Sequence, residues 1–163
     1  MSAAVELVAG TFRLVPSRSA VTFSVKHLFG LGTVSGAVPV VSGVVEVSDG
    51  AARISAVLDA AAIDTGNKRR DKDLRSPKFL ATEEFPTWEF TGAYSGVTIA
   101  GTLTAHGQPA ACHLAVQRVE RTGDRVDVVA TTTVDRRAHG VTAGRGLIGA
   151  ELAVELTICL MPG

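Results

Sequence analysis

The sequence predicts an all-β fold in which about eight antiparallel strands close into a barrel or a sandwich. Three observations lead to this prediction. Apolar and polar residues alternate through most of the chain, and turns rich in Gly, Asp or Pro separate the alternating segments. A helical pattern is confined to residues 67–84, where a short helical insertion is expected. Sequential hairpins that each have one apolar face must close on that face to keep it from water.

The strands of the first half are separated by local breaks. Residues 34–47 predict a strand pair broken near Pro39 and Gly43, and Asp49-Gly50 predicts a tight turn. The strands predicted before the insertion occupy residues 12–16, 17–27, 34–47 and 53–63.

The insertion at residues 67–84 carries the densest charge in the chain. Six of the sixteen Lys and Arg residues lie between positions 68 and 78. Asn67 predicts a helix N-cap, and Ser76 followed by Pro77 predicts a second helix start. A solvated crossover and a lid that meets an anionic head group both explain this stretch. Arg70 beside Asp71 likewise predicts either an ion pair that fastens the insertion or a head-group contact.

The second half alternates just as regularly. Turns are predicted at residues 106–109 and 122–124, and a loop that contains Arg136, Arg137, His139 and Gly140 precedes the last strand. The strands predicted here occupy residues 88–94, 97–105, 112–118, 126–134 and 148–160.

Small residues recur on the inward parity of these strands, among them Ala56, Gly92, Gly101 and Ala130. Small side chains do not fill a wide barrel, which favours an internal cavity. A flattened sandwich with tight packing explains the same residues, so the pattern alone leaves both architectures open.

Composition sets the class of protein. A chain of 163 residues is expected to form one domain over residues 1–163, and its zero net charge argues against nucleic acid as the main partner. The N-terminal segment has no pattern of a secretory signal and no stretch predicts a membrane span, so a cytoplasmic location is expected. Cys112 and Cys159 lie in separate strand-like segments, which predicts two buried, reduced thiols.

Patterns typical of catalysis, metals or cofactors are not found in the sequence. There is no Gly-x-Ser-x-Gly, no His-x-His or His-Glu-x-x-His, and no glycine-rich phosphate loop, so we expect neither a metal nor a cofactor. His27 ends the apolar face of residues 21–27 and is expected near one end of the barrel. It fits either a hydrogen-bonded core histidine or a ligand contact.

Several spaced segments, in order, resemble the YceI-like family of lipocalin-like polyisoprenoid-binding proteins. These segments are SRSAVTFSVKHLFGLGTVSG, IDTGNKRRDKDLRSPKFL, FPTWEFTG, IAGTLTAHG, VDRRAHGV and LIGAELAVEL. The resemblance implies an antiparallel eight-stranded lipocalin-like barrel with a helical insertion, whose apolar interior holds an isoprenoid chain or another amphiphile, such as an isoprenoid quinone or a fatty amide. The positions that match family motifs are His27, Arg70, Asp71, Leu74, Arg75, Arg136 and Gly140.

The chain departs from the family pattern at two places. Gly107-Gln108-Pro109 replaces the usual Gly-Val-Thr turn, and Phe79-Leu80 replaces an aromatic pair. These differences bear on the shape of the interior and the length of its ligand rather than on the fold.

We therefore predict a non-enzymatic protein that carries or sequesters a polyisoprenoid or related amphiphilic lipid. One alternative is a small enzyme or stress-response factor with His27 as general acid or base. Another is a filled barrel that acts as an interaction module, such as a homodimer. The candidate ligand-binding residues are Val21, Phe23, Val25, His27, Ile54, Leu58, Arg70, Leu74, Phe79, Trp88, Phe90, Leu103, Leu114, Val128 and Leu152.

Overall fold

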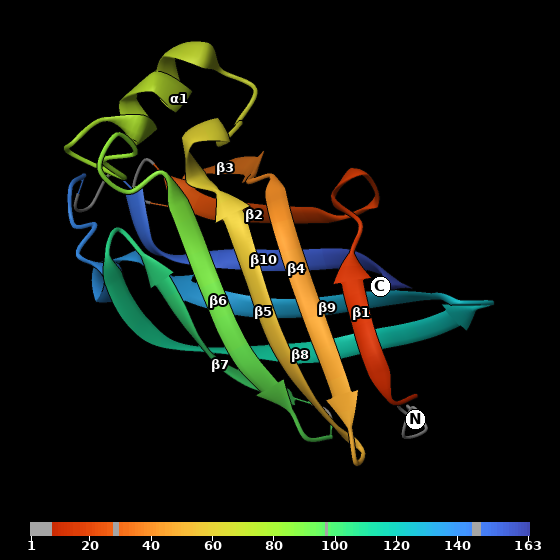
Figure 1. The fold of residues 1–163 in the computed structure, drawn as a ribbon. Coiled ribbons are helices and arrows are strands. Elements are labelled where there is room, and N and C mark those ends of the chain that lie inside the picture. The colour runs from red at the N-terminus through yellow and green to blue at the C-terminus, as the bar shows by residue number, and fades with distance from the viewer. Residues whose placement is uncertain (1–7, 28–29, 97, 145–147) are drawn as a thin grey trace.

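The computed structural model describes residues 8–27, 30–96, 98–144 and 148–163, and these form ten strands, one α-helix and three short 3-10 helices (Figure 1). In chain order the elements are β1 (Gly10–Leu14), η1 (Pro16–Arg18), β2 (Ala20–His27), β3 (Gly32–Ala37), β4 (Val40–Ser48), β5 (Ala51–Asp59), η2 (Ala60–Ala62), α1 (Lys68–Arg75), β6 (Thr87–Tyr94), β7 (Thr98–Ala105), β8 (Gln108–Thr122), β9 (Arg125–Asp135), η3 (Arg136–His139) and β10 (Ile148–Pro162).

The strands form one closed antiparallel barrel, as the alternation predicts. Neighbours from β4 to β10 pair in sequence order, and β1 closes the sheet by pairing with both β4 and β10. In Figure 1, β4, β5 and β6 pass in front of β8, β9 and β10, so the two halves of the barrel face one another. The apolar parity of each strand therefore faces a common interior.

The ten strands occupy eight positions around the barrel. Both β1 and β2 pair with β10, at opposite ends of that long strand, and η1 with Pro16 separates them. Similarly, β3 pairs with β2 and β4 pairs with β1, with Val38 and Pro39 between them. The first two strands of the barrel are thus each divided into two, because proline lacks the N–H that a continuous ladder needs.

Some predicted boundaries differ from the structure. The break expected near Gly43 is wrong, because β4 continues through this residue with a register irregularity between Val40 and Ser42. The turn expected at residues 106–109 is shorter, since β8 already begins at Gln108. The strand expected over residues 53–63 ends at Asp59, where η2 begins.

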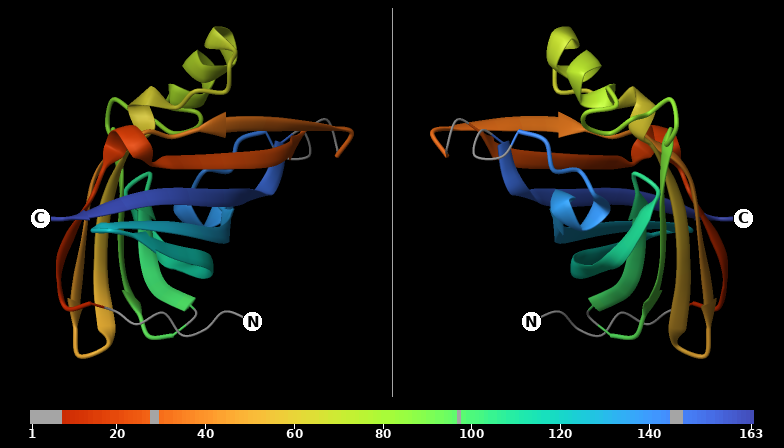
Figure 2. Two further views of the ribbon diagram at one scale, coloured as in Figure 1. Left: turned by 90° about the vertical axis from the view of Figure 1, so that its right-hand side faces the viewer. Right: turned by 90° about the vertical axis from the view of Figure 1, so that its left-hand side faces the viewer.

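The insertion contains one helix rather than two. The Asn67 side chain accepts a hydrogen bond from the Arg70 backbone N–H at 3.0 Å, which confirms the predicted cap. Ser76 ends α1 instead of starting a second helix, and turns follow it. Figure 2 shows α1 outside the barrel, on the side of β3.

Both cysteines are free and buried, as predicted. Cys112 belongs to a cluster on the inner face of β6, β7 and β8, while the backbone of Cys159 hydrogen-bonds to Val15 and to the Ser19 hydroxyl.

Within the described ranges, no helix has the length and apolar character needed to span a bilayer.

Candidate functional site

The barrel contains a cavity of about 300 Å³ that is lined almost entirely by apolar side chains. The polar or charged residues in its lining are Ser55, Tyr94, Arg121, Thr132, Arg136 and His139. Many apolar lining residues, such as Leu152, Val154 and Leu156, are only half-buried although they face inward. The interior is therefore incompletely filled, as the small inward residues suggested.

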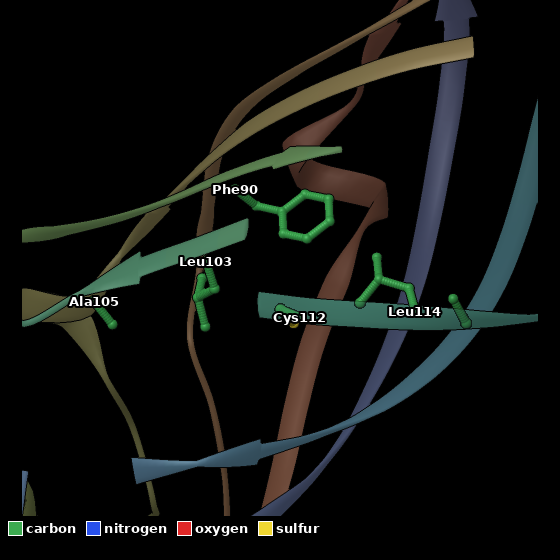
Figure 3. Close-up of a cluster of buried hydrophobic side chains, with 6 residues drawn as sticks. Phe90, Leu103, Ala105, Cys112 and Leu114 are labelled. Carbon is green, nitrogen blue, oxygen red and sulfur yellow. The ribbon is translucent and has the colours of Figure 1, made fainter. Parts of the chain in front are cut away.

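Ten of the fifteen candidate residues line this cavity, although contact with a ligand stays a prediction for each. They are Val21, Phe23, Ile54, Leu58, Trp88, Phe90, Leu103, Leu114, Val128 and Leu152. Figure 3 shows Phe90, Leu103 and Leu114 with Cys112 and Ala105, from three adjacent strands around the same space. The period-2 rule brings these residues together because alternate side chains of neighbouring strands share a face.

The other five candidates do not line the cavity. Val25 pairs with Leu152 and Val34 in the extension formed by β2 and β3. Leu74 packs against the cluster of Phe23, Val38 and Ile63 beneath α1. Phe79 is half-buried in the insertion, with the Lys78 ammonium 5.9 Å from the centre of its ring. The remaining two are His27 and Arg70.

Neither His27 nor Arg70 supplies a polar group to the cavity. The His27 ring lies over Gly32, its partner on β3, where a side chain would collide with it. The Arg70 guanidinium donates to the Thr65 hydroxyl at 2.8 Å and to the Thr65 carbonyl at 2.9 Å. The structure shows no Arg70–Asp71 ion pair. Asp71 instead accepts hydrogen bonds from the backbone N–H and the hydroxyl of Thr65. The hypothesis of an Arg70–Asp71 ion pair is therefore wrong.

Two polar lining residues, Arg136 and His139, belong to η3, in a segment where the sequence predicts a loop; we call this end of the cavity the inner end. His139 is 4% exposed, and its Nδ1 lies 2.8 Å from the Gln108 carbonyl. The His106 Nδ1 lies 3.0 Å from the His139 carbonyl, so two hydrogen bonds fasten η3 to the turn between β7 and β8 and to the first residue of β8. Gly140 ends η3 in the left-handed conformation, where Gly is favoured.

Arg136 holds the segment that follows η3. Its guanidinium donates to four backbone carbonyls: those of Gly149 and Ile148 at 2.9 and 3.1 Å, and those of Val141 and Ala143 at 3.0 and 2.6 Å. Burial, followed by repulsion from Arg137, lowers the pKa of Arg136, and Asp135 partly opposes this. These bonds use four of the five guanidinium N–H groups, so the charge serves mainly the fold.

Arg121 and Val8 mark the outer end of the cavity. Arg121 lies near the end of β8, paired with Val126 at the start of β9, whereas Arg136 follows the last residue of β9. About 30 Å of strand therefore separates the two ends. Val8 is 44% exposed and Arg121 is exposed, in contrast to the buried His139 and Val141.

The chemistry of this site is that of a binding pocket for an elongated apolar molecule. The cavity offers mainly methyl, methylene and aromatic surface, with few polar side chains in its lining. The involvement of Arg136 and His139 could not be derived from periodicity. The available signal was the VDRRAHGV segment, in which Arg136 and Gly140 match family motif positions.

Comparisons with known proteins agree with this architecture. The family model for the YceI-like domain matches residues 12–160. No curated protein sequence matches the chain. Among solved structures, BcnA from Burkholderia cenocepacia has a TM-score of 0.75 at 16% identity, covering 90% of this chain and 98% of its own.

Two further solved structures share the fold. A polyisoprenoid-binding domain from Saccharophagus degradans, implicated in plant cell wall breakdown, has a TM-score of 0.75 at 18% identity, covering 93% of this chain and 98% of that chain. The Campylobacter jejuni YCEI protein has a TM-score of 0.53 at 16% identity, covering 68% of this chain and 72% of its own.

Proposed function

The chain belongs to the YceI-like family, and on that premise we propose that its barrel binds a long-chain polyisoprenoid or a similar amphiphile. Isoprenoid quinones and fatty amides belong to this class of ligand. The protein then carries or sequesters the lipid and does not convert it chemically. The observation that carries this proposal is the apolar cavity of about 300 Å³ inside a closed barrel.

The cavity supports this ligand class through its chemistry and its shape. Each methylene group that leaves water contributes about 0.8 kcal/mol before the costs of association are subtracted. The lining extends from Val8 and Arg121 at one end to His139 and Val141 at the other, about 30 Å of strand apart, which suits a chain-like molecule better than a compact polar one. The polyisoprenoid-binding domain from Saccharophagus degradans has a similar fold, and this likeness supports a barrel that encloses a lipid.

The two alternative hypotheses receive less support from the structure. Catalysis by His27 requires this ring to meet the bound molecule, yet His27 lies outside the cavity lining and over Gly32. An interaction module with a filled barrel is difficult to reconcile with a cavity of about 300 Å³. A homodimer and a cytoplasmic location stay predictions from the sequence, to be tested by sedimentation and by cell fractionation.

The proposal is tested by native mass spectrometry of gently purified protein, followed by organic extraction and identification of the released molecule. We expect a stoichiometric lipid of the isoprenoid or fatty-amide class, or uptake of added polyprenyl lipid by the empty protein. Protein of bare mass that also takes up no added polyprenyl lipid contradicts the proposal.

Two neighbouring positions on β10 provide a matched pair of variants. Leu156 lines the cavity, whereas Thr157 is exposed on the outer face of the same strand. Leu156→Arg places a charge in the apolar interior and should abolish lipid binding. Thr157→Arg adds the same charge outside and should leave binding unchanged. Loss of lipid in both variants indicates that the strand, rather than the cavity, was disturbed.

A further inference from the structure

The insertion presents a group of cations to solvent. Three exposed Lys and Arg side chains lie on α1: Lys68, Arg69 and Lys72. Residues three and four apart on a helix are neighbours on its surface, so these three form one patch, which we call the basic patch. Lys78, which follows the helix, is exposed as well, and Asp73 is the one exposed acidic residue within residues 68–78. The segment therefore has a local excess of positive charge, although the net charge of the chain is zero.

The other side of α1 rests on the barrel. Asp71 is 7% exposed and accepts hydrogen bonds from Thr65, and Leu74 packs against a buried apolar cluster beneath the helix. With 3.6 residues per turn, Arg69 and Lys72 lie on the side of the helix away from these two contacts. Figure 2 shows α1 outside the barrel, so the basic patch faces solvent.

The basic patch has no ion-pair partner among the described residues. The ion pairs found there lie within β8, within β9 and between β9 and η3. Arg70, on the same helix, differs from the patch because its guanidinium donates to the Thr65 hydroxyl and carbonyl. Cations that the chain itself does not neutralise attract an anionic surface over about one Debye length, about 8 Å at physiological ionic strength.

The same insertion also borders the cavity. Leu80 is part of the cavity lining, and its backbone N–H donates to the Leu74 carbonyl at 2.9 Å, which ties this residue to the end of α1. One short segment therefore has an apolar side that reaches the cavity and a cationic side that faces outward. A lipid bilayer with anionic head groups matches both sides, because it offers charge to the cations and apolar molecules to the cavity. A nucleic acid matches only the charge.

We propose that the basic patch is a docking surface for an anionic lipid bilayer, and that docking places Leu80 and the adjoining part of the cavity next to the membrane. The choice of a bilayer as the partner rests on the proposed lipid-binding function. Each Lys or Arg near an anionic membrane surface strengthens binding about fivefold. A patch of this size gives a weak, salt-sensitive contact, from which a carrier can leave again.

The test measures flotation of the protein with vesicles of phosphatidylcholine alone or with about 30% phosphatidylserine. We expect binding to the phosphatidylserine vesicles only, and loss of this binding as NaCl rises from about 50 to about 500 mM.

Two triple variants of equal net charge locate the contact. Replacing the three residues of the basic patch by Gln should weaken binding about a hundredfold, the product of three fivefold effects. The control replaces three exposed arginines on β1, η1 and β5 by Gln and should weaken binding far less: Arg13, Arg18 and Arg53.

Three results overturn the docking surface. The wild-type protein binds both vesicle types equally or binds neither, the two triple variants lose binding equally, or a single-stranded RNA of about 20 nucleotides binds more tightly than the vesicles. The comparison of vesicles on the wild-type protein gives an answer even where a variant fails to fold.

The lipid-binding function is tested separately, by the native mass spectrometry described above. Protein that takes up lipid but shows no preference for anionic vesicles overturns only the docking surface. Protein that floats with anionic vesicles through the basic patch but takes up no lipid overturns only the proposed function.

Discussion

The Asp71 carboxylate accepts two hydrogen bonds from Thr65, one from the backbone N–H at 3.0 Å and one from the hydroxyl at 2.5 Å. Asp71 is 7% exposed and lies in the first turn of α1. Thr65 follows Asp64, which pairs with Ala37 at the end of β3. This contact therefore fastens the insertion to the barrel, a role that sequence analysis gave to Arg70 and Asp71 together.

Replacing Asp71 by Ala should lower the free energy of unfolding by about 1–3 kcal/mol, because both Thr65 donors lose a charged acceptor in a buried place. Urea unfolding followed by circular dichroism measures the change. Asp73→Ala is the control: Asp73 is exposed on the same helix. Equal losses in the two variants would contradict the role of the Thr65 contact.

Replacing Arg136 by Leu should cost roughly 2–4 kcal/mol of stability, because four backbone carbonyls lose their shared donor. The midpoint of urea unfolding should fall accordingly. Arg137→Leu removes only an exposed ion pair with Asp135 and should change the midpoint very little. A stable Arg136→Leu variant would show that water replaces the guanidinium.

Trp88 offers a direct readout of ligand binding, because it is the only tryptophan in the chain and lines the cavity. Titration with geranylgeraniol should shift its emission to shorter wavelength in a saturable way, since the lipid displaces water from the ring. The Leu156→Arg variant should show no such shift. A shift that never saturates, or one that persists in this variant, points to binding elsewhere.

The Cys112 thiol should react slowly with iodoacetamide in the native protein. Burial raises the pKa of this thiol, a hydrogen bond with Thr132 opposes the change, and only the thiolate reacts. A bound lipid should slow the reaction further, because Cys112 lines the cavity. Alkylation rates read by mass spectrometry in a Cys159→Ala background test this, and unfolding in urea should restore the rate of a free thiol.

The raised pKa also predicts a pH dependence. As the pH rises past the pKa of the unfolded thiol, the unfolded chain releases a proton that native Cys112 retains. The stability contributed by this thiol is thus complete at lower pH and declines as the pH approaches the native pKa. Cys112→Ala should flatten this alkaline decline in urea unfolding, and an unchanged profile would assign the decline to other groups.

Much of the fold follows from local pattern. Alternation places Phe23, Phe90 and Leu114 on inward faces, and the cap at Asn67 starts the helix where expected. Two predictions, a second helix start at Ser76-Pro77 and a strand break near Gly43, are wrong for the same reason. Ser76-Pro77 and Gly43 carry residue types that often break or start elements, yet the hydrogen bonds of the surrounding chain decide whether they do so.

The alternation alone predicts one apolar face for each strand, because a strand exposes alternate side chains to opposite faces whatever its neighbours are. The closure of these faces into a barrel, and the polar groups that reach its interior, depend on tertiary contacts. His139 and Arg136 lie in a segment without periodicity, and their positions depend on partners such as Gln108 and Gly149. Long-range hydrogen bonds of this kind produce no regular residue spacing in the sequence. The polar groups at the inner end of the cavity can therefore be identified only from the folded structure.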